Sequence, residues 1–73
     1  MIAKEETIIL QIINEKKLIR KSELEKLIKD VEGVSPAMVN GLIEKGLVSD
    51  LSPLGETSFI LTQEGIKALR EEA

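Results

Sequence analysis

The stretch "SELEKLIKDVEG", residues 22 to 33, constrains the fold most strongly, because it carries both a start and a stop signal for one helix. Ser22 and Glu25 form the S-x-x-E capping-box pattern of a helix start. Four apolar residues then recur at the spacing of a single helical face: Leu24, Leu27, Ile28 and Val31. Gly33 suits the left-handed position that follows a helix end. The stretch predicts an amphipathic helix over about residues 22–31.

A second short helix is predicted over about residues 36–45. Ser35 is a suitable N-cap, Pro36 suits the first helical position, and Gly46 is placed to end the helix. The residues expected to face the core are Val39, Leu42 and Ile43. Because only the residues "VEGV" separate the two helices, we expect them to form a helix-turn-helix.

The first helix is predicted over about residues 3–17, and its apolar surface is unusually wide. Its apolar residues are Ile8, Ile9, Leu10, Ile12 and Ile13, and they spread over roughly 200° of the helix. A helix packed on one side needs about half of that width. Either the helix lies deep in the domain, or one side of it meets a second subunit. The second alternative predicts a homodimer through this helix, with an interface formed by Ile9, Leu10 and Ile13.

Beyond Gly46 the pattern predicts a β-hairpin over about residues 47–62, followed by a last helix over 63–72. The hairpin strands are expected at Leu47–Leu51 and Thr57–Leu61, joined by the turn "SPLGE". A short strand at 18–20 could add to it. Thr62 is expected to cap the last helix, whose inner face is predicted to carry Ile66 and Leu69. The sequence therefore predicts one mainly α domain, residues 1–73, with a small β-hairpin (an α+β fold).

Three segments resemble parts of the winged helix-turn-helix domain. "SELEKLIK" resembles its second helix, "VSPAMVNGLIEKGLV" its recognition helix running into the wing, and "LTQEGIKAL" the strand-to-helix passage after the wing in MarR-like and related archaeal and bacterial regulators. The resemblance implies the order helix, short strand, helix, helix, hairpin, helix. It also implies a dimeric transcriptional regulator whose third helix enters the DNA major groove, while the hairpin touches the DNA backbone or the minor groove.

Carried onto this chain, the resemblance assigns a small set of positions to DNA. The groove-facing residues of the third helix would be Ala37, Asn40, Gly41 and Glu44, flanked by Met38 and Lys45. The hairpin tip would be residues 52–56, which include Pro53 and Leu54. Asn40 is chemically suited to reading adenine, because its amide can form two hydrogen bonds with that base.

The distribution of charge bears on DNA binding, which depends on neutralising phosphates with cations. The chain has a net charge of −3, and between residues 30 and 66 its only cation is Lys45, against Asp30, Glu32, Glu44, Asp50, Glu56 and Glu64. Residues 14–29 are net positive. Their candidate phosphate contacts are Lys16, Lys17, Arg20 and Lys21. The alternative is a solvated surface in which Glu25 pairs with Lys29.

Composition removes several classes of function. With no cysteine and no histidine, the chain lacks the commonest strong nucleophile, the commonest general base and the usual zinc ligands. We therefore expect no enzyme, no metal and no cofactor. No apolar run approaches the roughly 20 residues of a membrane helix, and a cytoplasmic protein is expected. Two hypotheses stay open: a duplex-DNA-binding regulator, and a winged helix used as a protein–protein interaction module.

Overall fold

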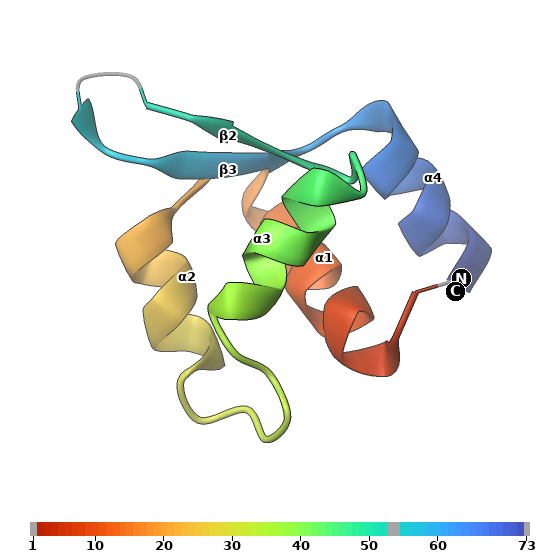
Figure 1. Ribbon diagram of the computed structural model, residues 1–73, viewed down its shortest axis with the longest axis horizontal. Helices are drawn as coiled ribbons and strands as arrows, with labels where there is room; N and C mark the ends of the chain where they lie inside the picture. Colours follow the sequence, from red (N-terminus) through yellow and green to blue (C-terminus); the bar gives the residue numbers. More distant parts are fainter. Residues whose placement is uncertain (1, 53–54, 73) are drawn as a thin grey trace.

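The computed structural model describes residues 2–52 and 55–72, and in this part of the chain four helices pack with a three-stranded antiparallel sheet (Figure 1). The elements are α1 (Lys4–Lys16), β1 (Ile19–Arg20), α2 (Lys21–Ile28), α3 (Ala37–Glu44), β2 (Val48–Leu51), β3 (Ser58–Leu61) and α4 (Gln63–Glu72). The predicted α+β class and the predicted order of elements are confirmed. None of the described helices is long and apolar enough to cross a membrane.

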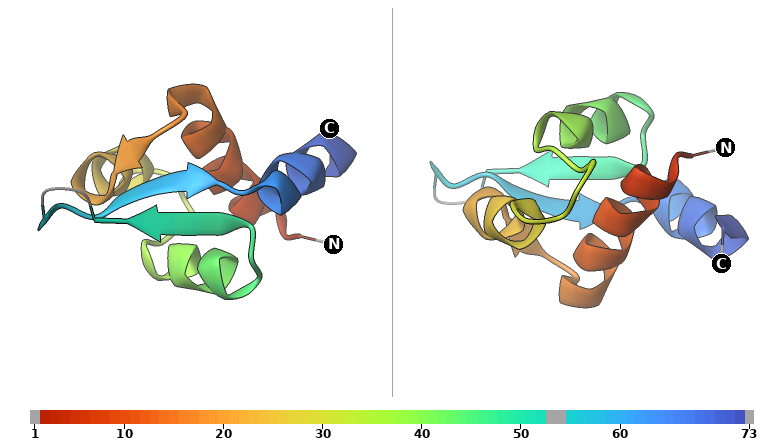
Figure 2. Two further views of the ribbon diagram at one scale, coloured as in Figure 1. Left: turned by 90° about the horizontal axis from the view of Figure 1, so that it is seen from above. Right: turned by 90° about the horizontal axis from the view of Figure 1, so that it is seen from below.

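The sheet has the strand order β1-β3-β2, so the central strand is the last in sequence (Figure 2). Phe59 of β3 pairs with Ile19 on one side and with Asp50 on the other. Helices α1, α2 and α3 lie on one side of the sheet, whereas α4 continues from β3 beyond its end and contacts α1. The sheet therefore covers one side of the three-helix layer formed by α1, α2 and α3 (Figure 1).

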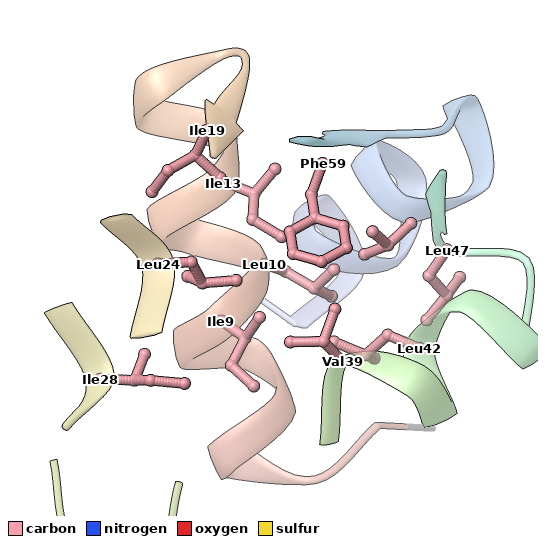
Figure 3. Close-up of a cluster of buried hydrophobic side chains, with 11 residues drawn as sticks. Ile9, Leu10, Ile13, Ile19, Leu24, Ile28, Val39, Leu42, Leu47 and Phe59 are labelled. Atoms are coloured by element: carbon pink, nitrogen blue, oxygen red, sulfur yellow. The ribbon is translucent and has the colours of Figure 1, made fainter. Parts of the chain in front are cut away.

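The core lies between these three helices and the inner face of the sheet (Figure 3). It is aliphatic except for Phe59, and every element from α1 to β3 contributes to it. Its buried residues are Ile9, Leu10, Ile13, Ile19, Leu24, Ile28, Val39, Leu42, Leu47, Val48 and Phe59. Helix α1 supplies the centre of this cluster, which explains its wide apolar surface.

The predicted dimer interface is wrong. Ile9, Leu10 and Ile13 are each 0% exposed within a single chain, so their side chains have no surface to offer a second subunit. The wide apolar arc of α1 arises because α2, α3, β3 and α4 all pack around this helix. The first alternative, a helix deep in the domain, is the correct one. A homodimer stays a prediction, but these three side chains cannot form its interface.

The start and end of α2 differ from the prediction of a helix over 22–31. The helix begins at Lys21, and Ser22 makes no capping hydrogen bond. The strand pairing decides this start, because the Lys21 amide donates to the Thr57 carbonyl at 2.9 Å as β1 passes directly into the helix. The helix ends at Ile28, so Val31 lies beyond it and the predicted apolar stripe is shorter by one residue. Within the helix, Leu27 is 44% exposed.

Helix α3 begins one residue later than predicted, with Pro36 rather than Ser35 at its N-cap and without a side-chain cap. It ends at Glu44, one residue before the predicted end, and Gly46 closes it as predicted. Gly46 has a φ of 79°, and the amides of Gly46 and Leu47 donate to the carbonyls of Ile43 and Leu42, each at 3.0 Å. This pair of bonds is the Schellman motif, which closes a helix on a left-handed glycine.

Hydrogen bonds from Thr62 join the end of α3, at Gly46 and Leu47, to the start of α4. The Thr62 hydroxyl accepts the Gly65 amide at 3.0 Å, which confirms Thr62 as the cap. That hydroxyl also donates to the Gly46 carbonyl at 2.6 Å, and the Thr62 amide donates to the Leu47 carbonyl at 3.1 Å. The predicted inner face of α4 is only half right, because Leu69 packs on the core whereas Ile66 is 41% exposed.

Candidate macromolecule-binding surface

Four residues form the outward side of α3, here called the α3 face: Ala37, Asn40, Gly41 and Glu44. Ala37, Asn40 and Glu44 are exposed and Gly41 is half-buried, as predicted for positions opposite the core stripe. A Cβ atom at Gly41 would meet nothing within 4 Å. Glycine in a helix interior costs about 1 kcal/mol relative to alanine, and no contact among the described residues requires it here. The α3 face is therefore small, uncharged except for Glu44, and open to close approach by another molecule.

Lys45, the flanking cation of this helix, is held by α1. Its ammonium lies 2.7 Å from Oε2 of Glu6, whose side chain is only 13% exposed. The second carboxylate oxygen of Glu6 accepts the Ala3 amide at 2.9 Å. The hydrogen bond from Lys45, followed by that from the Ala3 backbone, holds the pKa of Glu6 below its usual value of 4.5. Lys45 therefore fastens the end of α3 to the start of α1.

Replacing Glu6 with glutamine is expected to lower the free energy of unfolding by about 1 kcal/mol at neutral pH, a modest value because Lys45 stays half exposed. Since the pKa of Glu6 is lowered in the folded state, the stabilisation is fully present above pH 4.5 and is lost as pH falls through the folded-state pKa. Urea unfolding across this range checks both points. Glu15→Gln, at an exposed position on the same helix, is the control. A difference between Glu6→Gln and wild type that stayed constant into strong acid would contradict the pairing.

The predicted phosphate patch is only partly available for an anion. Lys16 lies 3.9 Å from a carboxylate oxygen of Glu23, and Arg20 lies 3.8 Å from one of Glu56. All four of these side chains are about half exposed or more, so each pair is a weak, solvated one. Lys17 and Lys21 have no carboxylate within 4 Å among residues 2–52 and 55–72. The Glu25–Lys29 pair of the solvated-surface alternative does not form, because no ion pair within 4 Å joins these two side chains among residues 2–52 and 55–72.

A groove that the sequence did not predict lies between α2, α3 and the inner face of the hairpin, and we call it the α2–α3 groove. It encloses about 320 Å³. Its apolar lining residues are Leu24, Ile28, Pro36, Ala37, Val39, Ile43 and Phe59. Its polar lining residues are Lys21, Glu25, Asn40, Asp50 and Thr57. Two residues of the α3 face, Ala37 and Asn40, therefore also line the groove.

One signal in the sequence could have indicated the groove. Residues alternate between the two faces of a strand, and Val48 of β2 is buried on the inner face. Asp50 therefore also lies on that face, directly opposite Phe59. A charged residue at an inner position of a strand predicts that the core is open at this point.

A smaller hollow of about 220 Å³ adjoins the groove, because Lys21, Glu25 and Thr57 line both. Ser22 and Glu56 complete its lining. The predicted hairpin-tip residues Pro53 and Leu54 lie outside the described residues, so the surface is defined here without them. In the described part of the chain, no group of three metal-ligating side chains converges.

Comparison of the chain with protein-family models, with curated proteins and with solved structures gave no match. The functional interpretation therefore depends on the chain's own geometry and charges.

Proposed function

We propose that the chain is a winged-helix domain that works as a protein–protein interaction module and binds its partner through the α3 face and the α2–α3 groove. The order of elements supports the winged-helix assignment, because a hairpin follows the third helix and pairs with the short strand β1. This arrangement leaves the α3 face exposed beside the hairpin (Figure 1).

The ion pair between Lys45 and Glu6 is the observation that favours a protein partner over DNA. It engages the only cation between residues 30 and 66 with a carboxylate of α1. What the α3 face and the groove then present is apolar surface, Asn40, Lys21 and the carboxylates of Glu25, Glu44 and Asp50. Phosphate contacts dominate DNA affinity and need cationic or hydrogen-bonding donors. A surface with this excess of carboxylates suits a protein partner better than a duplex.

Duplex-DNA binding is the second candidate, and the cations of α2 and its surroundings favour it. Four exposed lysines between residues 17 and 29 have no carboxylate within 4 Å in the described ranges: Lys17, Lys21, Lys26 and Lys29. Such cations would contact phosphates without reading bases, so this candidate expects weak, sequence-independent binding that falls steeply with salt.

A photo-crosslinking residue placed at Asn40 tests the proposal in the source cells. We expect a discrete protein adduct that mass spectrometry identifies. Overexpression of the unlabelled wild-type domain should reduce the amount of this adduct, because the two compete for the same partner. The matched control is the same crosslinker at Lys67, an exposed position on α4. Adducts to DNA alone at residue 40, or the same protein adducts at both positions, would contradict the proposal.

Adding cations to this surface is expected to create DNA binding. The double variant Glu44→Lys, Asp50→Lys should bind duplex DNA at low salt, with a slope of log affinity against log salt steeper by up to about 2 than that of wild type. Fluorescence anisotropy measures this slope. The control is Glu64→Lys, Glu71→Lys, which adds the same charge on α4. Equal DNA binding by both variants would show that net charge, rather than the winged-helix geometry, produces the effect.

A further inference from the structure

We infer that the α2–α3 groove binds a basic amphipathic segment of the partner protein, with a lysine or arginine side chain lying between Glu25 and Asp50. This inference depends on the proposed interaction function and names the chemistry of the partner. It is supported by the lining of the groove, by the balance of charge around it and by its extent.

The lining of the groove combines apolar surface with carboxylates. Pro36 and Ala37, which are exposed, and Ile43, which is half-buried, contribute the apolar surface that a ligand can reach. Beneath them lie the buried core residues Leu24, Ile28, Val39 and Phe59. Glu25 lines the groove from α2, and Asp50 lines it from the hairpin. Lysine and arginine have an apolar stem and a cationic head, so they can pack on such a surface while their charge meets a carboxylate.

The charges around the groove select a cationic ligand. Three carboxylates line the groove and the adjoining hollow, from Glu25, Asp50 and Glu56, together with the single lysine Lys21. Glu56 is paired with Arg20 at 3.8 Å, which leaves Glu25 and Asp50 against Lys21. Among residues 2–52 and 55–72, no cation lies within 4 Å of the carboxylate of Glu25 or Asp50. A phosphate or an acidic peptide would be repelled here, whereas a basic segment would supply the missing counter-charges.

The extent of the groove suits a peptide segment. The groove and the adjoining hollow have volumes of about 320 Å³ and 220 Å³ and share three lining residues, so they lie side by side. Together their lining residues run from α3 across the start of α2 to Glu56. A single small molecule would occupy one part, whereas a helix or an extended segment with apolar and basic side chains can fill both.

A titration of the ¹⁵N-labelled full chain tests the inference. The probe is a 15-residue helical peptide of leucine and lysine with all leucines on one face, and the matched probe replaces every lysine with glutamate. We expect the leucine–lysine peptide to shift the backbone amides of Leu24, Val39, Asp50 and Phe59, and the glutamate version to leave them unchanged. The variant Glu25→Gln, Asp50→Asn should bind the leucine–lysine peptide about tenfold more weakly. Glu71→Gln, an exposed carboxylate on α4, should bind it as wild type does.

Each other outcome overturns the inference. Peptide-induced shifts outside the groove, or equal affinity of Glu25→Gln, Asp50→Asn and wild type, would exclude the groove as the site for a basic segment. Shifts of the groove amides by duplex DNA and by neither peptide would assign the groove to nucleic acid. If the peptide fails while the crosslinker at Asn40 still captures a partner, only the groove inference fails. If both the peptide and the crosslinker fail, the proposed interaction function is also contradicted.

Discussion

Replacing Gly65 with alanine is expected to lower the free energy of unfolding by about 3 kcal/mol. Gly65 is buried in the first turn of α4, and a Cβ atom there would overlap the carbonyl oxygen of Leu47. That oxygen already accepts the Thr62 amide at 3.1 Å, so it cannot withdraw without breaking the lock between α4 and the end of α3. Alanine must therefore push apart two backbone segments rather than a flexible side chain.

Gly41→Ala is the matched control for this expectation. Both glycines lie in helices, and helix propensity alone would favour alanine by about 1 kcal/mol at either position. At Gly41 an added Cβ meets nothing within 4 Å, so this variant should be more stable than wild type. Urea unfolding of the two variants measures the contrast. A Gly65→Ala variant as stable as Gly41→Ala would contradict the close contact between α4 and Leu47.

Leu10→Ala is expected to lower the free energy of unfolding by about 3 kcal/mol and to leave the oligomeric state unchanged. Leu10 is fully buried at the centre of the core, beside Ile9 and Ile13 on α1 (Figure 3). Domains of this size have only about 5 kcal/mol or slightly more in total. The variant should therefore unfold at a much lower urea concentration, while light scattering gives the same mass as wild type.

Leu18→Ala provides the comparison for Leu10→Ala, because Leu18 is 50% exposed and should contribute less than about 1 kcal/mol. If Leu10→Ala instead kept its stability and changed the mass in solution, Leu10 would belong to a subunit interface after all. That result would contradict the position of α1 at the centre of the core.

Local signals predicted the parts of the fold that depend on local chemistry. Gly46 ends α3 and Thr62 caps α4 because each acts through the backbone of its own neighbourhood. Ser22 carries an equally good local signal, yet it makes no cap, because pairing of β1 with β3 fixes the chain one residue earlier. Whether Leu10 faced a core or a partner could not be settled from one helix, since the answer depends on the elements that surround it.

The candidate surface was predicted less completely than the fold. The exposed positions of α3 followed from its apolar periodicity, and the structure leaves Ala37, Asn40 and Glu44 exposed. The partner of Lys45 could not be predicted, because Glu6 lies 39 residues away in sequence and is brought close only by packing of α3 on α1. The α2–α3 groove was missed for the same reason, since three separate segments form it.

Titration of duplex DNA into the wild-type protein at low salt, followed by backbone amide shifts, distinguishes a protein-binding α3 face from a DNA-binding one. If the α3 face binds protein, DNA should leave residues 37–45 unshifted, and any weak shifts should be confined to the lysines of residues 16–29 and disappear as salt is added. Saturable binding that shifts Ala37, Asn40 and Glu44, and that persists at physiological salt, would contradict the proposed protein-binding role of the α3 face. It would instead identify the chain as a DNA-binding protein.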